Sequence, residues 1–140
     1  MEAEETARRA AEAMWADDRA SQALGMELVV VAPGAATLRM TVREDMVNGH
    51  AIGHGGLTFA LADSAFAFAC NSYNRVTVAA GADVRFRAPT RLGDVLLATA
   101  TERSRDGRDG VYDVLVTRER DGTVVAEFVG RSREVGGTLF

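Results

Sequence analysis

The sequence predicts an α+β fold, in which one antiparallel sheet of about five or six strands curls around a long central helix and a further helix precedes it. Three observations support this fold class: a helix-forming first segment, a nearly uncharged helix-forming run over residues 54–73, and alternating apolar and polar segments on both sides of that run. The order is therefore helix, two strands, helix, four strands. A sheet must curl to cover a helix that is apolar all round.

The first segment, from about Glu5 to Ala23, is rich in alanine and charged residues that favour helix, and Gly25 provides a stop. We expect residues 1–24 to form an N-terminal capping helix and residues 25–140 to form the core. A chain of 140 residues fits one domain and is too short for two ordinary cores.

Strand patterns follow on both sides of the central run. Residues 25–45 predict two strands joined at "APGA", because Leu38, Met40 and Val42 alternate with polar residues. Residues 76–89 predict a third strand, with Val84 and Phe86 on one face and a break at Pro89. Three more strands follow, separated by "SRDGRDG" and by Asp121-Gly122, a dipeptide typical of hairpins.

Alanine and leucine favour a helix of about 18 residues in the central run, and its apolar residues predict a helix buried on every side. Asp63 is the only charged residue in this run. A carboxylate is almost never fully buried without a partner. Asp63 is therefore either a structural carboxylate tied to backbone or arginine, or a reactive acid.

Composition excludes several classes of function. The formal net charge of −4 argues against general binding to nucleic acid, which depends on neutralising phosphates. All 16 basic residues are arginine, so mechanisms that need a lysine Schiff base or a phosphate-loop lysine are excluded. The acidic start and the lack of an apolar run of about 20 residues favour a cytoplasmic protein without membrane contact.

The sequence offers little for metal or redox chemistry. Cys70 is the only cysteine, which excludes an intrachain disulfide, and we interpret it as a small apolar residue of the helix. His50 and His54 have a spacing that binds metal on a helix, but Gly49 and Gly53 make a helix unfavourable there. We expect no metal site.

The sequence contains a series of motifs, which in chain order are Asn48, His54-Gly55-Gly56, Asp63 within "LADSAFAFACNS", and "VRFRAPTRLGD". This series resembles the hotdog-fold acyl-CoA thioesterases, most closely the PaaI-type (phenylacetyl-CoA thioesterase-like) branch. The similarity runs from about Met26 to the last strand. It implies a hotdog fold and hydrolysis of acyl-CoA thioesters without a metal or bound cofactor, in keeping with phenylacetate degradation. It also implies a homodimer with shared active sites, assembled further as a dimer of dimers.

The resemblance assigns roles to particular residues. Asn48 and the backbone N–H of Gly55 correspond to groups that hold and polarise the thioester, with His54 beside them, and Asp63 corresponds to the group that attacks or activates water. Gly56, Gly81, Arg87 and Arg91 are implied in substrate binding. There is one departure: where relatives often carry a serine or threonine to position the water, this chain has Ala79, Ala80 and Gly81.

The chemistry of these residues fits thioester hydrolysis. The reaction passes through an oxyanion, and the free N–H groups at a helix start are suitable donors for it. However, eight residues separate Gly55 from Asp63, or about 12 Å along one helix, whereas reacting atoms must approach to about 3–3.5 Å. Two helices related by a two-fold axis would each contribute one of these groups, so the spacing itself favours a dimer.

Several alternatives stay open at this point. Gly55 and Gly56 also fit a plain helix-start turn, and Asn48 fits an Asx-turn. Arginines 85, 87 and 91 either face solvent or contact the phosphates of coenzyme A.

Two classes of function compete. The first is an acyl-CoA thioesterase that converts aryl or medium-chain acyl-CoA, such as phenylacetyl-CoA or its hydroxylated relatives, to free acid and CoA. The second is a non-catalytic hotdog module that binds acyl thioesters or serves in assembly. A dehydratase of the same fold is a third possibility, but the aspartate and histidine spacing typical of those enzymes is missing.

Overall fold

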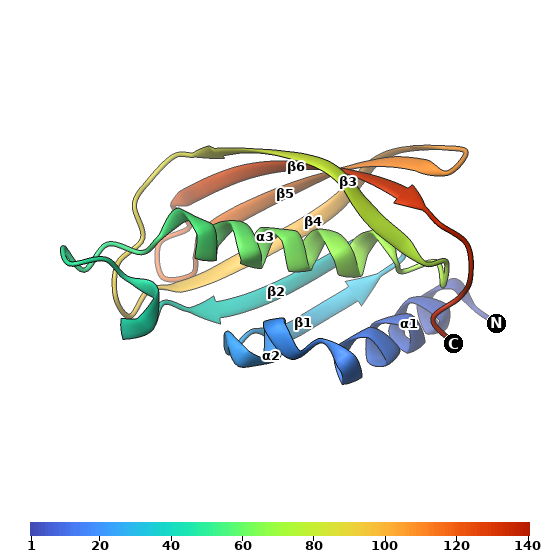
Figure 1. The fold of residues 1–140 in the computed structure, drawn as a ribbon, viewed down its shortest axis with the longest axis horizontal. Coiled ribbons are helices and arrows are strands. Elements are labelled where there is room, and N and C mark those ends of the chain that lie inside the picture. The colour runs from blue at the N-terminus through green and yellow to red at the C-terminus, as the bar shows by residue number, and fades with distance from the viewer.

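The computed structural model describes the whole chain, Met1–Phe140, and shows one sheet rolled around a central helix (Figure 1). Its helices are α1 (Ala3–Asp17), α2 (Arg19–Ala23) and the central α3 (Gly55–Cys70), with a 3-10 turn at Glu44–Met46. Its strands are β1 (Glu27–Ala32), β2 (Ala35–Thr41), β3 (Thr77–Phe86), β4 (Val95–Asp106), β5 (Asp109–Arg118) and β6 (Val124–Glu134). The predicted order of elements is confirmed apart from a break in the first helix.

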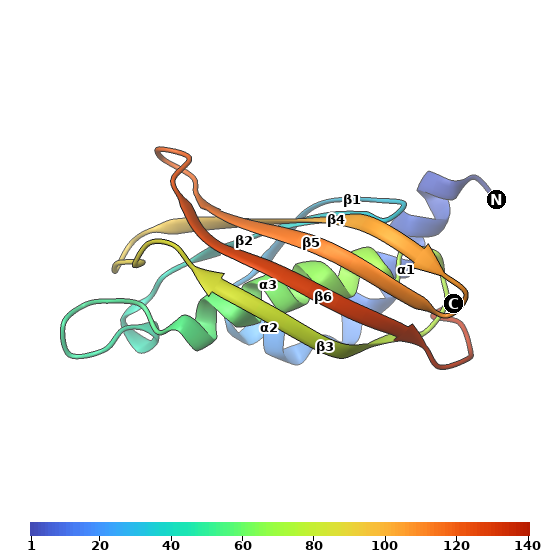
Figure 2. The same cartoon turned by 90° about the horizontal axis from the view of Figure 1, so that it is seen from above.

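The six strands form one antiparallel sheet in the order β1-β2-β4-β5-β6-β3. Seen from above, the curved sheet lies over α3 and covers it (Figure 2). The first and third strands form its two edges, because the chain crosses over through α3 between β2 and β3. No helix is long and apolar enough to cross a membrane.

Small side chains allow α3 to lie close to the sheet. The inner face of the strands carries alanine or glycine at several buried positions, and α3 presents buried alanines toward it; these residues are Ala36, Ala98, Ala100, Ala126, Gly130, Ala62, Ala65 and Ala69. Register pairs some of them directly, as in Ala36 with Ala100 and Leu38 with Ala98. The helix is therefore embedded in the concave face at high packing density.

Larger rings fill the space on one side of α3. Phe66 lies 5.7 Å from Tyr112 and 5.9 Å from Phe128, measured between ring centroids, and all three rings are almost fully buried. The backbone of Gly130 passes directly against the Phe66 ring, so that a Cβ there would lie 2.8 Å from its atoms. This contact fixes the rotation of α3 against β6.

The expectation of one helix from Glu5 to Ala23 is wrong. The chain leaves helical geometry at Asp18 (φ −84°, ψ 81°), whose carboxylate accepts a hydrogen bond from the N–H of Ser21 at 3.0 Å and so caps α2. Asp18 is a favourable N-cap residue, and the cap satisfies a donor that a new helix start leaves free. The predicted stop at Gly25 is confirmed by its positive φ of 73°.

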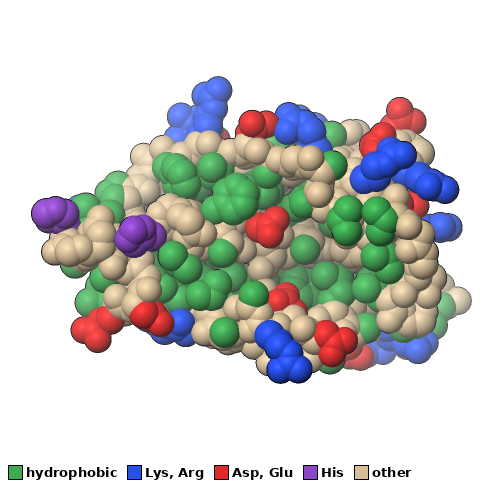
Figure 3. Space-filling view, viewed as in Figure 1, with side chains coloured by type: hydrophobic (Ala, Val, Ile, Leu, Met, Phe, Trp, Pro, Cys, Tyr) green, Lys and Arg blue, Asp and Glu red, His purple; other side chains and the backbone are tan.

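The expectation that the central helix is buried on every side is also wrong for a single chain. Gly56 is exposed, and Ala60, Asp63, Ser64 and Ala67 are half-buried. Figure 3 shows this face, where hydrophobic side chains surround acidic atoms over α3 and between α3 and the N-terminal helices. The sheet wraps one side of α3 and leaves this strip uncovered.

The hairpins lie where the sequence places them, but the strands reach further into them. The fourth strand continues to Asp106 and the fifth begins at Asp109, so the turn contains only Gly107 and Arg108. Gly107 and Gly122 both have positive φ values, 61° and 72°, which glycine adopts at little cost.

Gly130→Ala tests the packing of α3 on the sheet. We expect a loss of about 1–3 kcal/mol in the free energy of unfolding, because the added methyl group meets a buried ring that has no room to move. Gly49→Ala is the matched control, since nothing lies within 4 Å of a Cβ there. Urea unfolding of both variants measures the difference; equal stability would show that the core is looser at Phe66 than described.

Candidate active site

Two parts of the chain that are distant in sequence meet at one end of the molecule: the loop 47–54 with the start of α3, and the end of β3 with the residues that follow it. The loop folds back on itself through a bond from the N–H of Asn48 to the carbonyl of Ile52 (2.9 Å). It is then tied to the chain after β3 by a bond from the N–H of Gly53 to the carbonyl of Thr90 (2.9 Å), beside a bridge between Ile52 and Arg91. The predicted site residues of these segments are thus brought together.

The start of α3 offers unpaired donors. His54 is the N-cap residue but its side chain makes no capping bond, and the N–H groups of Gly55 and Gly56 have no backbone acceptor. Donors of this kind, at the positive end of the helix dipole, favour a developing negative charge. The helix start can therefore stabilise an oxyanion.

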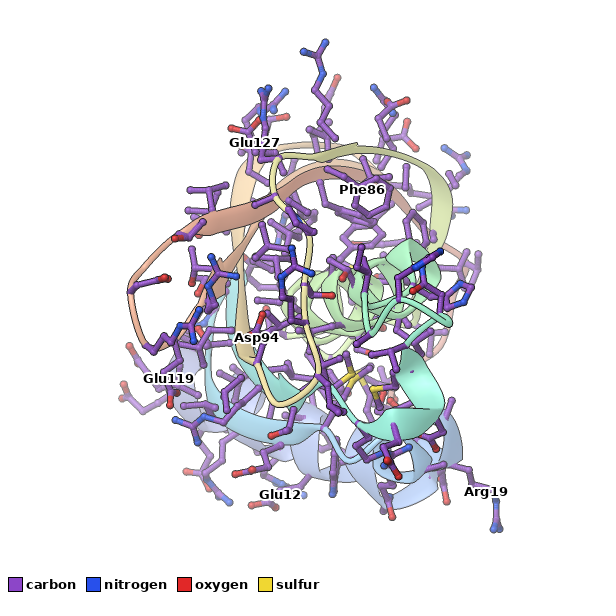
Figure 4. All side chains as sticks on the ribbon, turned by 90° about the vertical axis from the view of Figure 1, so that its left-hand side faces the viewer. Glu12, Arg19, Phe86, Asp94, Glu119 and Glu127 are labelled. Carbon is purple, nitrogen blue, oxygen red and sulfur yellow. The ribbon has the colours of Figure 1, made fainter.

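Phe86 forms a wall beside these donors. Seen along α3 from its start, Phe86 lies above the helix (Figure 4), and a Cβ at Gly55 would lie 2.9 Å from its ring. A hollow of about 300 Å³ opens here, lined by apolar and polar residues from both segments: Gly53, Gly55, Thr58, Phe86, Arg87, Ala88, Pro89, Thr90 and Val125. A side chain at Gly55 would therefore displace the ring of Phe86.

Asn48 makes an Asx-turn, one of the two roles expected for it from the sequence. Its Oδ1 accepts hydrogen bonds from the N–H groups of His50 (2.9 Å) and Ile52 (3.2 Å). Its Nδ2 group makes no hydrogen bond with the protein, and the side chain is exposed. The turn therefore orients the amide while leaving its two N–H donors free for a ligand.

Asp63 lies in the middle of α3, half-buried, with no hydrogen bond or ion pair to the protein. Burial raises the pKa of its carboxyl above the ordinary value, and the negative charge of Asp18 raises it further. Within one chain neither an arginine nor the backbone holds this carboxylate, so the structural interpretation has no support from the contacts of the chain. A carboxylate this poorly solvated and unpaired is suited to act as a base or nucleophile.

The separation expected along the helix is real. Gly55 and Asp63 belong to one uninterrupted α-helix of 16 residues, so their backbones lie about 12 Å apart along its axis. One chain cannot bring both groups to the same carbonyl.

The remaining predicted residues fall into two groups. Near the helix start, His54 is exposed and donates its backbone N–H to the carbonyl of Met46 (2.8 Å), and Gly56 is open to solvent. Gly81 lies away from them, at a β-bulge in the middle of β3. The structure does not bring Gly81 to the hollow within one chain.

The two arginines have different surroundings. Arg87 donates from Nε to Glu127 at 2.7 Å on the outer side of the sheet, while Arg91 is exposed and its backbone N–H is bound by Asp94 (2.9 Å). The guanidinium of Arg91 makes no hydrogen bond or ion pair with the protein and is free for an anion.

The largest hollow, about 830 Å³, lies on the outer face of the sheet and is lined by charged residues that include the Arg103–Asp113 and Arg87–Glu127 ion pairs. The sheet separates it from α3 and from the free N–H groups at the helix start. The smaller hollow at the helix start is the candidate active site, because it alone places free donors beside an apolar wall.

Cys70, near the end of α3, is buried, and burial raises the pKa of its thiol to about 12. The thiolate is the reactive form of cysteine, so this residue is an apolar core side chain, as predicted.

Sequence reasoning misses two features of the site region, the contact of Phe86 with Gly55 and the cap that Asp18 makes with Ser21. The alternation of β3 puts Phe86 on the helix side, which its register opposite Ala126 confirms, but nothing in the pattern indicates its contact with Gly55. Asp18 and Ser21 fit a plain helix by propensity. Only the pairing of an aspartate with a serine three residues later signals a cap there.

The comparisons with known proteins fit this geometry. Residues 50–125 match the model of the Thioesterase superfamily, and the chain belongs to that family. The chain is 42% identical over 129 residues to the acyl-coenzyme A thioesterase PaaI of Escherichia coli K12, covering 92% of this chain and 91% of that protein.

Solved structures agree. The E. coli PaaI protein superposes with a TM-score of 0.95 at 39% identity, covering 98% of this chain and 99% of the other. A variant of the phenylacetic acid degradation protein PaaI from Thermus thermophilus superposes at 0.80 with 35% identity, covering 84% and 100%. The expected hotdog fold and PaaI type are thereby confirmed, and the protein is a thioester hydrolase of the acyl-CoA thioesterase class.

Asp63→Asn should stabilise the protein at neutral pH. The folded-state pKa of Asp63 is raised, so the folded protein loses stability as pH rises from the ordinary aspartate pKa, about 3.9, through that raised value. The variant lacks this loss. Its advantage in melting temperature over wild type should be present at pH 7 and shrink below about pH 4.

Asp113→Asn provides the control with the opposite sign. A hydrogen bond from Arg103 lowers the pKa of Asp113, so Asp113→Asn should lose stability at pH 7. The loss should be small, because the ion pair is exposed to solvent. A drop in melting temperature for Asp63→Asn at neutral pH would contradict the raised pKa of Asp63.

Proposed function

We propose that this acyl-CoA thioesterase hydrolyses aryl or medium-chain acyl-CoA to free acid and CoA, with Asp63 as nucleophile or general base. The observation that carries the proposal is the half-buried, unpaired carboxylate of Asp63 on the same helix whose start offers free N–H donors. Thioester hydrolysis needs these two kinds of group and no bound cofactor.

The reaction follows from these groups. The thioester oxygen accepts hydrogen bonds from the N–H of Gly55 and from Nδ2 of Asn48, which polarise the carbonyl. Attack by the Asp63 carboxylate, or by water that gives its proton to Asp63, forms a tetrahedral oxyanion held by the same donors. Its collapse breaks the C–S bond and releases the CoA thiolate, which takes up a proton. Where an acyl-aspartyl anhydride forms, water attacks it, releases the free acid and regenerates the Asp63 carboxylate.

The shape of the hollow supports the substrate class. Phe86, Pro89 and Val125 line it beside the donors, and its volume of about 300 Å³ suits a phenyl ring or a medium acyl chain. The guanidinium of Arg91 is free for a CoA phosphate, whereas Arg87, which lines the hollow, would contact one only by leaving Glu127. Gly56 is open to solvent beside His54 and leaves room there for the rest of the substrate, whereas Gly81 lies away from the hollow and would contact substrate only from the partner chain.

A dimer with shared sites completes the proposal. One helix cannot bring Gly55 and Asp63 to one carbonyl, so the donors come from one chain and the carboxylate from its partner. The third strand is a free edge with exposed Val78 and Phe86, and the uncovered strip of α3 lies beside it. A partner docked there by a two-fold axis covers both, and pairs of dimers form the tetramer.

Asp63→Asn should reduce kcat by about two orders of magnitude or more, because the amide neither accepts a proton nor attacks well. Free thiol release from a panel of phenylacetyl-CoA, hydroxylated phenylacetyl-CoA, medium-chain acyl-CoA and acetyl-CoA measures both the loss and the substrate preference. Near-normal turnover in the variant would remove Asp63 from the mechanism. A wild-type preference for acetyl-CoA over the aryl substrates would contradict the proposed class.

Mixing two inactive variants tests the shared site. Asn48→Asp keeps the Oδ1 acceptor that holds the loop but removes the amide donor. It is preferred to Gly55→Pro, which would remove the other donor but place a proline ring atom against Phe86. In a dimer of Asn48→Asp with Asp63→Asn, one site carries both lesions and the other carries none. With random exchange, half of the dimers are mixed, so activity should recover to about a quarter of wild type.

Exchange is confirmed by pull-down with two different tags, and each variant alone serves as the control. If mixed dimers form and activity stays at the level of the separate variants, each chain supplies a whole site.

A further inference from the structure

A chain of hydrogen bonds joins the N-terminal segment to α3 next to Asp63. Ser21 donates its hydroxyl hydrogen to Oδ2 of Asp18 at 2.7 Å, and its Oγ lies 2.8 Å from Oγ of Ser64. A serine hydroxyl has one hydrogen, and Ser21 has given its own to Asp18. Ser64 must therefore be the donor to Ser21, which makes the Asp18 carboxylate the end of a three-member chain.

This chain is shielded from water and held in place. Ser21 is 2% exposed, while Asp18 and Ser64 are half-buried. The N-terminal helices are also docked on α3 through Trp15, whose ring lies 6.1 Å from that of Phe68. The carboxylate of Asp18 is thereby fixed relative to α3, on the side of the helix where Asp63 is left uncovered by the sheet.

We propose that Asp18 is a positioning residue of this thioesterase: its carboxylate, anchored through Ser21 to Ser64 beside Asp63, favours the transfer of a proton to Asp63 during the reaction. The inference rests on the proposed role of Asp63. A second carboxylate that carries no reacting atom favours the protonated form of the first, so proton uptake from water during the reaction becomes easier.

The charges around Asp63 support this assignment. Burial is the larger cause of the raised pKa of Asp63, and the negative charge of Asp18 is the second. Cys70 also interacts with Asp63, but its thiol has a pKa of about 12 and is neutral. From the strands packed on α3, the inner face contributes Glu102, which is bound by Tyr73 and Tyr112. Four arginines on or next to these strands, Arg39, Arg87, Arg103 and Arg131, make ion pairs on the outer face, and Arg105 lies near Glu102 and over the Tyr73 ring. Arg85 makes no ion pair and alternates with Phe86 toward the outer face.

Asp18 also caps α2, and the test must separate that structural role from its charge. Asparagine and serine cap helices as well as aspartate does, because each offers a side-chain oxygen to the N–H two or three residues later. Asp18→Asn and Asp18→Ser therefore keep the cap and remove the charge. Asp17→Asn is the matched control: Asp17 is the adjacent acid, exposed, at the end of α1.

The experiment combines the pH profile of kcat/KM with a titration of the Asp63 carboxyl carbon by NMR. With Asp18→Asn we expect the acidic limb of the profile and the Asp63 titration to move together to lower pH. The activity at the plateau should fall, but by less than the about 100-fold loss expected when the base itself is removed. Asp17→Asn should leave both curves at the wild-type position.

The possible results separate the two roles of Asp18. A folded Asp18→Asn or Asp18→Ser variant with both curves unchanged overturns the proposal, as does an equal shift in Asp17→Asn. If the NMR titration moves while the acidic limb stays, Asp18 acts on Asp63 but Asp63 is not the base, and the proposed function fails instead. If neutral variants at Asp18 lose only melting temperature and keep both curves, Asp18 is a helix cap and nothing more.

Discussion

The close approach of α3 to the concave face of the sheet is the constraint on which the rest of the structure depends. Alanines on both sides of this contact, and Gly130 against the ring of Phe66, remove the side-chain volume that would hold the helix away. A helix embedded in this way has a fixed axis and a fixed rotation. Its start must then emerge at one end of the roll, and one strip of its surface must remain outside the sheet.

Both parts of the site follow from that placement. The emerging start leaves the N–H groups of Gly55 and Gly56 without acceptors, beside Phe86 from the edge strand. The uncovered strip carries Asp63, which is poorly solvated because its neighbours are apolar and unpaired because no arginine faces it. The same rigid helix that positions these groups keeps them about 12 Å apart along its axis, and this distance is the ground on which we propose that a second chain completes the site.

Much of this arrangement was predictable from the sequence. Alternation located Leu38, Met40 and Phe86 on the helix side of their strands, and the lone charge in the central run identified Asp63. The break at Asp18 was not predictable from helix propensity, since residues 5–23 all tolerate helix and only the side-chain cap to Ser21 interrupts it. The uncovered strip escaped prediction for a different reason: it carries the same small apolar residues as the buried side of α3, so composition does not tell the two sides apart. Part of the site was also predictable. The spacing of Asn48, Gly55 and Arg91 in the sequence motifs indicates that they lie together, and backbone hydrogen bonds do hold their segments at one end of the fold. The contact of Phe86 with Gly55 and the coupling of Asp18 to Asp63 depend instead on the twist of the sheet and the docking of α1 and α2, which periodicity does not encode.

The most direct test of the shared site is a crystal structure of the protein with a non-hydrolysable acyl-CoA analogue, in which the reacting carbonyl is located against both chains. The carbonyl oxygen is expected within hydrogen-bond distance of the Gly55 N–H of one protomer. The carbonyl carbon should lie within about 3–3.5 Å of a carboxylate oxygen of Asp63 from its partner, or be linked to it through one water. A carbonyl bound on the outer face of the sheet, or contacted by Asp63 and Gly55 of the same chain, would contradict the shared site.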